Sequence, residues 1–206
     1  MKVLRGTGEY ILVEKHSRFI CRCAPAASET DARAVIEAVR ASHRTASHHV
    51  YAFGVRENGD RFYTRHSDDG EPQGTAGLPT LDVLQKQGLA DCAIVVTRYF
   101  GGTLLGAGGL ARAYSQAAST AIEAAGVVTM AACALLQIKC AYSFYAKLQA
   151  LVAEGGGVIL NTEFAEEVSM GLRIREKDAD GLVAEIIDAS NGQAECEITG
   201  SEFAAT

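Results

Sequence analysis

Residues 168–175 read Val-Ser-Met-Gly-Leu-Arg-Ile-Arg, and this stretch decides the fold of the C-terminal part of the chain. Apolar residues alternate with polar or small residues, which is the pattern of a strand with one buried face. A second strand is expected at 158–164, and a short acidic turn joins the two. The pair therefore places a strand–turn–strand unit at the centre of this part.

The sequence on either side of these strands completes a regular order of elements. Before them, residues 127–140 form an apolar, β-compatible run, and Ser143 is placed to cap a helix that ends at three consecutive glycines. After them, Asp178 is placed to cap a second helix, and Asn191-Gly192 turns the chain into a last strand at 194–199. The order β-α-β-β-α-β predicts a ferredoxin-like fold.

The first 125 residues predict a separate α+β domain, and Gly126 is expected to separate it from a second domain, 127–206. Ser28-x-x-Asp31 is a helix-start signal, and Asn58-Gly59 is a strong hairpin signal. The expected strands are 10–14, 18–23, 50–56, 61–66 and 94–97, and the expected helices are one that opens at Ser28, one at 80–87 and one at 107–125. A chain of 206 residues accommodates two such α+β domains.

The composition is that of a globular protein, with 48% hydrophobic and 21% charged residues. The formal net charge of −6 is unevenly distributed. Residues 1–125 hold 14 Lys and Arg against 13 Asp and Glu, with all five His, whereas residues 126–206 hold 5 against 12. This distribution excludes a basic nucleic-acid-binding surface over the whole chain and leaves only a local patch in the first part.

The sequence also predicts where the protein resides. Residues 1–6 contain no apolar segment of a secretory signal, and no apolar run approaches the roughly 20 residues that cross a bilayer. The six cysteines include no Cys-x-x-Cys, and Cys21 and Cys23 are expected on one face of a strand. We expect a cytoplasmic protein with reduced thiols, no membrane contact, no metal and no cofactor.

Two segments stand apart from this structural background because they concentrate glycine. Residues 67–79, the acidic segment, read Ser-Asp-Asp-Gly-Glu-Pro-Gln-Gly-Thr-Ala-Gly-Leu-Pro. Residues 97–114, the glycine-rich segment, read Thr-Arg-Tyr-Phe-Gly-Gly-Thr-Leu-Leu-Gly-Ala-Gly-Gly-Leu-Ala-Arg-Ala-Tyr. Both are expected at strand ends of one small domain, so we expect them to meet in a composite surface.

The glycine-rich segment leaves a strand and enters a helix, which is a place where backbone N–H groups bind anions. Gly106-x-Gly108-x-x-Ala111 fits only the loose dinucleotide pattern, and no acidic residue closes a following strand. Arg98 and Arg112 leave a general anion or phosphate site open. The alternative, that the glycines serve only close packing and positive φ, has about equal weight.

The acidic segment allows two interpretations. Its three carboxylates can bind a divalent cation, but their spacing is not that of an EF-hand, and we favour a turn in which Asp side chains accept backbone N–H groups. His48 and His49 lie on a strand and point to opposite faces, so at most one can join a given site. Ser67 lacks a surrounding Gly-x-Ser-x-Gly, so serine catalysis is not expected.

The two segments together resemble the YigZ/IMPACT family, over roughly residues 40–115. The length and two-part layout are similar to those of full-length bacterial members. The resemblance implies an N-terminal module of ribosomal-protein/elongation-factor type and a C-terminal ferredoxin-like domain similar to one in elongation factor G. Many members have Lys where Leu104 stands, and Asn and Cys where His49 and Val50 stand. The missing Lys weakens the phosphate hypothesis.

The resemblance also implies a role in translation. Eukaryotic members restrain the stress kinase that senses uncharged tRNA, by competing for its activator, and bacterial members are suspected of binding nucleic acid or the translation apparatus. The resemblance supplies no catalytic residues. We therefore expect a non-enzymatic, translation-associated regulator whose partner is RNA, the ribosome or a translation factor. The alternatives are a protein–protein regulator without nucleic-acid contact and a metal-dependent hydrolase that uses Asp68, Asp69 and Glu71.

In the expected surface, Arg98 and Arg112 contact phosphate, Tyr99 and Phe100 stack on bases, and the glycines allow close approach. The acidic C-terminal domain is expected to contact protein or to orient the first domain. The sequence leaves the oligomeric state open. The candidate binding residues are His48, Arg65, Ser67, Asp68, Asp69, Gly70, Glu71, Pro72, Gly74, Thr75, Arg98, Tyr99, Phe100, Gly101, Gly102, Gly106, Gly108, Gly109, Arg112 and Tyr114.

Overall fold

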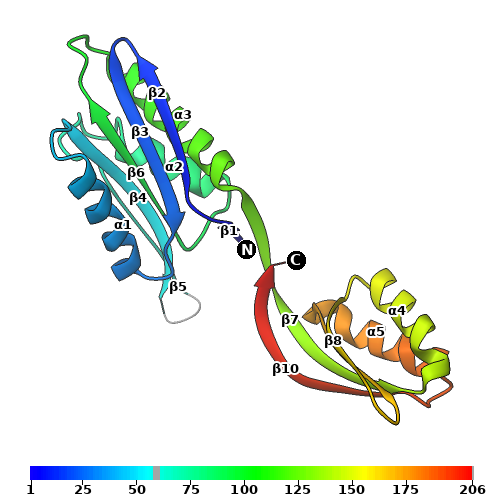
Figure 1. Ribbon diagram of the computed structural model, residues 1–206. Coiled ribbons are helices and arrows are strands. Elements are labelled where there is room, and N and C mark those ends of the chain that lie inside the picture. The colour runs from blue at the N-terminus through cyan, green and yellow to red at the C-terminus, as the bar shows by residue number, and fades with distance from the viewer. Residues whose placement is uncertain (58–60, 206) are drawn as a thin grey trace. The chain divides into compact units, whose positions relative to one another are not determined.

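The computed structural model describes residues 1–57 and 61–205. These residues form two compact units, an N-terminal unit, Met1–Thr129, and a C-terminal unit that begins at Met130 (Figure 1). Each unit has its own sheet and its own helices, which confirms the mixed α+β class. Gly126, the expected domain boundary, caps the last helix of the N-terminal unit with a φ of 71°.

The N-terminal unit is built on a five-stranded antiparallel sheet with the order β2-β3-β6-β4-β5. The short strand β1 (Lys2–Leu4), which the sequence did not reveal, pairs instead with the first residues of β7 (Val127–Cys140). The strands of the main sheet are β2 (Gly8–Glu14), β3 (Ser17–Pro25), β4 (His48–Glu57), β5 (Arg61–Ser67) and β6 (Cys92–Tyr99).

Helices cover both faces of this sheet. Helix α1 (Glu29–Ser42) packs on one face, and α2 (Gly77–Lys86) and α3 (Ala107–Ala125) pack on the other (Figure 1). The central strand β6 is therefore buried on both sides, which is why its sequence is apolar without alternation. Its side chains nevertheless alternate in space, with Ile94 and Val96 on the α2/α3 face and their neighbours on the α1 face.

Local sequence signals explain where α1 and α2 begin, although α2 begins earlier than predicted. Ser28 caps α1 as predicted, since its Oγ accepts the Asp31 backbone N–H at 3.1 Å. Helix α2 begins at Gly77 and not at Thr80. Pro79 then lies in the first turn, where its missing N–H has no intrahelical partner to lose.

The C-terminal unit has the predicted ferredoxin-like order of elements. Its sheet has the antiparallel order β8-β9-β7-β10, and its two helices share one apolar core with the buried faces of the strands. The elements after β7 are η1 (Tyr142–Phe144), α4 (Tyr145–Glu154), β8 (Val158–Phe164), β9 (Val168–Arg175), α5 (Glu176–Ala189) and β10 (Glu195–Ala205).

Both predicted helix caps in this unit are wrong. Ser143 lies inside the 3₁₀ turn η1 and makes no side-chain cap. Asp178 lies in the first turn of α5, where it pairs with Arg175 at 2.8 Å. The last strand is also longer than predicted, because a register shift between Ile198 and Gly200 lets pairing with β7 continue. The predicted Asn58-Gly59 turn lies outside the described residues.

Two further observations concern the general character of the chain. Within residues 1–57 and 61–205, no helix is long and apolar enough to cross a membrane. All six cysteines are free, and Cys21 and Cys23 are both fully buried in the core between the sheet and α3. Burial raises the pKa of Cys23 to about 11 and that of Cys92 to about 12, so these thiols stay protonated at neutral pH.

Candidate partner-binding site

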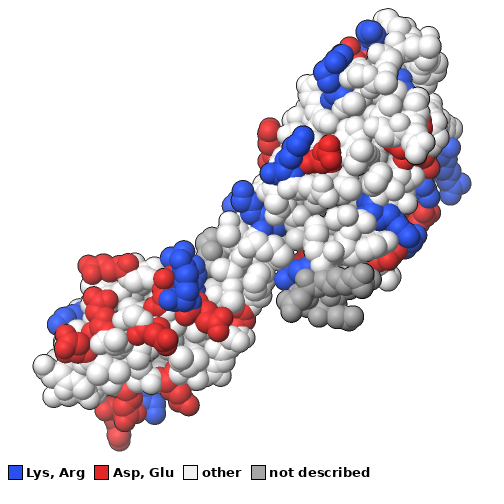
Figure 2. All heavy atoms as spheres, turned by 180° about the vertical axis from the view of Figure 1, so that it is seen from behind, with Lys and Arg blue, Asp and Glu red and all other residues white. Residues whose placement is uncertain are grey.

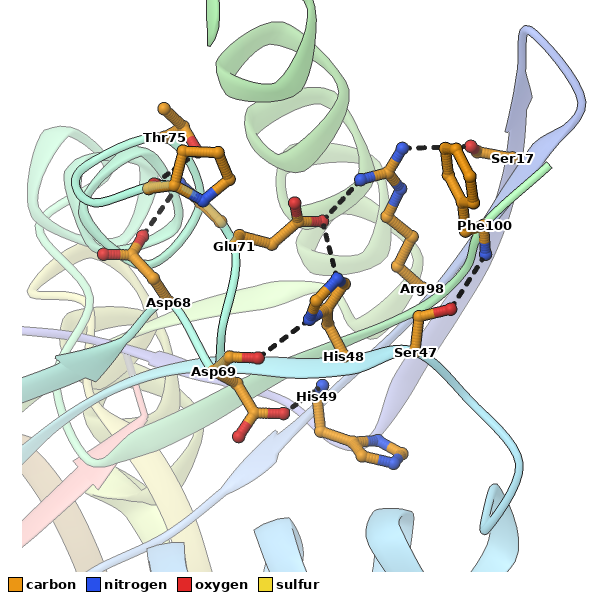
Figure 3. A network of polar contacts seen from close by, with 12 residues as sticks. Ser17, Ser47, His48, His49, Asp68, Asp69, Glu71, Thr75, Arg98 and Phe100 are labelled. Atoms are coloured by element: carbon orange, nitrogen blue, oxygen red, sulfur yellow. Dashed lines mark hydrogen bonds and ion pairs between the residues drawn. The ribbon is translucent and has the colours of Figure 1, made fainter. Parts of the chain in front are cut away.

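The acidic and glycine-rich segments meet through one buried carboxylate. Oε1 of Glu71 accepts a hydrogen bond from Nη1 of Arg98 and another from Oη of Tyr114, each at 2.7 Å. Nη2 of Arg98 donates to Oγ of Ser17 at 3.1 Å. The side chains of Arg98 and Glu71 are only 5% and 3% exposed. The structure thus joins the two segments as the sequence suggested, but below the surface (Figure 3).

His48 extends this network from the neighbouring strand. It lies opposite Arg98 in the β4–β6 pairing, and its Nδ1 is 2.8 Å from the carbonyl oxygen of Asp69. Because a carbonyl only accepts, Nδ1 carries the proton, and Nε2 faces Oε1 of Glu71 at 4.0 Å. His49 points the other way, toward Thr97 at 3.2 Å, as strand alternation predicts (Figure 3).

Burial changes the role that Arg98 and Tyr114 can have. We expected Arg98 to contact phosphate, but Glu71 and Ser17 already occupy its terminal nitrogens, and the rings of Phe19 and Phe100 lie 5.2 and 5.4 Å from its guanidinium carbon. Burial and the Glu71 carboxylate hold the pKa of Tyr114 well above its usual value, so it remains a donor. Both residues position Glu71.

The acidic segment forms a turn held by its first aspartate. Oδ1 of Asp68 accepts the N–H groups of Ala76 and Gly77 at 3.0 and 2.8 Å, and Oδ2 accepts that of Gly74 at 2.9 Å. Burial alone would raise the pKa of Asp68, but these three N–H groups hold it below its usual value. This is the turn interpretation that the sequence favoured.

The other carboxylates of the segment are directed elsewhere. Asp69 accepts the backbone N–H of His49 at 2.6 Å and pairs with Arg40 at 3.2 Å, while Glu71 faces Arg98. Within the described part of the chain, no group of three His, Cys, Asp or Glu side chains could hold a metal ion. Oγ of Ser67 accepts the Asp69 N–H at 3.2 Å. These contacts give the segment a structural, loop-fixing role.

Backbone geometry explains most of the glycines in the two segments. A Cβ on Gly101 would overlap the backbone of His16, and one on Gly77 would overlap the backbone of Ser67. Four more have positive φ angles between 74° and 87°, a region that residues with a Cβ rarely adopt. These four are Gly70, Gly74, Gly102 and Gly106.

Beside the buried network lies a cavity of about 440 Å³, which we call the α3 cavity. Its walls are mostly apolar, and its polar lining comes from the network itself. Leu104 and Phe100, 82% and 48% exposed, lie at its rim. The lining residues are His48, Glu71, Pro72, Arg98, Phe100, Leu104, Leu105, Gly106, Ala107 and Leu110.

Some candidate residues are not brought to this cavity. Tyr99 lies on the α1 face, where its hydroxyl is 3.0 Å from Nδ1 of His43 and its ring is under the guanidinium of Arg18. Arg65 pairs with Glu29 of α1 at 3.1 Å. The remaining candidates are not among the residues that line the cavity. Thr75 bonds the Pro72 carbonyl, and Gly109 and the exposed Arg112 lie on α3.

Sequence reasoning missed several residues of the site. Leu105, Ala107 and Leu110 line the cavity, yet they read as ordinary apolar residues of a loop and a helix start. Ser17 supports Arg98 from a position 81 residues away, and no local pattern reveals that contact. The signal that was available is the spacing of Ala107 and Leu110, one helical turn apart on one face.

Comparison with known proteins places these features in a family. The family model of the Impact N-terminal domain matches residues 15–122, which include both segments, and a domain of unknown function, DUF1949, matches residues 138–193. IMPACT family member YvyE of Bacillus subtilis (strain 168) is 33% identical over 192 residues, which cover 93% of this chain and 88% of YvyE. YigZ of Escherichia coli (strain K12) is 33% identical over 178 residues, 86% and 87% of the two chains.

A solved structure extends the similarity to the whole chain. The crystal structure of a hypothetical protein covers 98% of this chain and 98% of its own length, with 30% identity and a TM-score of 0.60. The sequence and structural similarities therefore span both units. This chain belongs to the IMPACT family.

Proposed function

We propose that this protein is a non-enzymatic, translation-associated regulator whose N-terminal unit binds a protein of the translation apparatus in the α3 cavity. Membership of the IMPACT family supports the link to translation, through the role that the resemblance implies. The observation that carries the choice of site and partner is the apolar cavity between the two segments that distinguish this chain.

The character of the cavity favours a protein partner over bare RNA. A nucleobase carries several polar edge atoms, and the lining of the cavity is mostly apolar, so few lining groups could meet those atoms. The buried ion pair also leaves little net positive charge for phosphates. In the view of Figure 2, Lys and Arg of the N-terminal unit are dispersed among Asp, Glu and uncharged residues and form no continuous basic face.

The size of the cavity suits one anchoring side chain. A volume of about 440 Å³ lies in the range of ligand pockets, roughly 300–1,000 Å³. Burying one large apolar side chain there contributes about 1.5–3 kcal/mol. An anchor of this kind, set in a water-excluding pocket, has the character of an interface hot spot.

The C-terminal unit supports the same partner class. Acidic residues predominate on its face in Figure 2, and residues 126–206 hold 12 Asp and Glu against 5 Lys and Arg. Such a surface repels nucleic acid, and we assign it a part in protein contact or in orienting the N-terminal unit.

Site-specific photo-cross-linking in cells tests this function. A photo-reactive phenylalanine replaces Leu104, which is 82% exposed and has no polar side-chain atom. A matched variant carries the same group at Ile198 of the C-terminal unit, which is 57% exposed. We expect position 104 to cross-link to a ribosomal protein or translation factor, identified by mass spectrometry. We expect position 198 not to cross-link to the same protein.

Salt dependence separates the two partner classes. An apolar contact changes little between 50 and 200 mM salt, whereas binding through many phosphates weakens by about 10³–10⁵-fold over that range. Cross-links from position 104 to RNA, with binding that salt abolishes and that Arg112→Ala weakens, would show an RNA-binding protein instead. Cross-links only to proteins outside translation would contradict the proposed role.

A further inference from the structure

The α3 cavity has one polar end that the apolar walls do not explain. Gly106 and Ala107, at the start of α3, line it. No side chain caps this helix and its first turn holds no acidic residue. The first N–H groups of a helix have no intrahelical partner, and the helix dipole places partial positive charge there. These first N–H groups are therefore donors that the helix itself does not use.

A second, independent donor belongs to Arg98, which is also one of the residues that line this cavity. The side chain of Arg98 is 5% exposed and lines the cavity, and its Nε has no hydrogen-bond partner among the described residues. Each of its two terminal nitrogens donates a hydrogen bond, Nη1 to Glu71 and Nη2 to Ser17. Figure 3 shows the guanidinium held between Glu71 and Phe100. A buried donor without an acceptor costs free energy, which a ligand acceptor would recover.

Gly108 adds a third observation, because nothing in the fold requires a glycine there. It lies in the first turn of α3, its φ is not positive, and a Cβ would meet only Nη1 of Arg112, at 3.6 Å. Glycine in a helix is destabilising relative to alanine. A bare backbone at this point lets a ligand approach the N–H groups closely, beside the guanidinium of Arg112.

We propose that the α3 cavity binds a carboxylate-bearing apolar group of the partner polypeptide, with the apolar body against Pro72, Phe100 and Leu105 and the carboxylate at the start of α3 and Nε of Arg98. The protein nature of the partner rests on the proposed function. A carboxylate fits better than a phosphate, because the buried Glu71 lies 2.7 Å from Nη1 of Arg98 and would repel a dianion more strongly.

Titration of the ¹⁵N-labelled full chain with small probes tests this ligand class. N-acetylphenylalanine carries the ring and the carboxylate, and N-acetylphenylalaninamide carries the ring without the charge. We expect the carboxylate probe to shift the amide signals of residues 107–109 and the Nε–H signal of Arg98. We expect it to bind at least about ten times more tightly than the amide, which corresponds to about 1.4 kcal/mol.

Gly108→Ala removes the close approach while keeping every described contact. We expect it to weaken the carboxylate probe at least about ten-fold without lowering the melting temperature. Gly181→Ala is the matched control, because Gly181 lies in α5 and a Cβ there would meet nothing within 4 Å. It should leave binding of the probe unchanged.

Three results would overturn the proposal. They are equal affinities for the two probes, no shift at residues 107–109 or at Arg98 Nε, and an unchanged affinity in Gly108→Ala. Tighter binding of phenyl phosphate would assign the cavity to a phosphate ligand instead. Because these titrations use no cellular partner, a probe that binds as expected while position 104 cross-links outside translation would overturn the proposed function alone.

Discussion

The interiors of the two units differ in how many polar and charged side chains they bury. The buried polar or charged residues of the described chain are Ser17, Glu71, Thr75, Thr80, Thr97, Arg98 and Ser190, and Ser190 is the one that belongs to the C-terminal unit. That unit folds around an apolar core and keeps its ion pairs at the surface, as with Arg173 and Glu202. A unit of this family can thus be built without buried charge.

From this difference we expect that the core of the N-terminal unit would be stable without the buried Arg98–Glu71 pair. Taking two charges out of water costs several kcal/mol per ion, and a well-packed apolar replacement is often as stable. Both residues of the pair line the α3 cavity. We therefore attribute the polar core of the N-terminal unit to its binding site.

The largest expected effect comes from breaking the pair on one side. Glu71→Leu leaves the Arg98 guanidinium buried without its carboxylate, so we expect the N-terminal unit to lose about 3–5 kcal/mol of unfolding free energy. Urea unfolding, followed by NMR signals of each unit, measures it. The triple variant Glu71→Leu, Arg98→Met, Tyr114→Phe should recover most of the loss. A triple variant as unstable as the single one would show that the pair serves stability.

The apolar core of the C-terminal unit should respond to volume alone. Leu172 is fully buried in β9, and Leu172→Ala should cost that unit about 2–5 kcal/mol through lost burial and the cavity left behind. NMR signals of the C-terminal unit in the same urea titration report the change. A pH-dependent loss would contradict a core without charges.

A smaller effect is expected where the acidic segment is held together. Asp68→Asn weakens three bonds from backbone N–H groups and should cost the N-terminal unit about 1–2 kcal/mol at pH 7. The pKa of Asp68 is lower in the folded protein than in the unfolded chain. Its contribution is therefore full above the unfolded value, about 3.9, and is lost as pH falls through the folded value.

The measurement for this prediction is the stability difference between wild type and Asp68→Asn as a function of pH. It should be constant from pH 7 to 5 and shrink below about pH 4. A difference that stays constant down to pH 2, or grows on acidification, would mean that the Asp68 charge does not hold the turn.

The smallest expected effect has the opposite sign. Gly108→Ala should raise the stability of the N-terminal unit by at most about 0.5–1 kcal/mol, the gain known for a helix interior, because alanine replaces a first-turn glycine that has room for a Cβ. Thermal unfolding compares it with Gly181→Ala, which should raise the stability of the C-terminal unit similarly. A loss of stability in Gly108→Ala would give that glycine a structural reason and remove its place in the site.

The same contrast explains what the sequence could reveal. The C-terminal unit exposes one face of its sheet, so the alternation in residues 168–175 predicts its strand and its fold. Strand β6 is buried on both faces, so its sequence shows no period, and the burial of Arg98 could not be predicted. Which face receives Arg98 and which receives Tyr99 depends on helices that pack from distant parts of the chain.

The candidate site, like the fold, could be predicted from the sequence only in part. That the acidic and glycine-rich segments meet follows from their positions at strand ends, and the turn around Asp68 follows from its residue types. The cavity does not, because its apolar walls come from residues that read as ordinary core. The predicted helix cap at Ser143 was wrong because this residue lies inside the 3₁₀ turn η1, and helix α4 begins only after that turn.

The most direct test of the account combines binding and stability in one variant. Gly108→Ala is introduced beside the photo-reactive group at position 104, and the yield of the cross-linked translation protein is compared with that of the parent in cells. We predict that the yield falls at least several-fold while the melting temperature of the protein does not fall. An unchanged yield, with the protein equally abundant, would contradict the claim that the start of α3 and its cavity form the binding site.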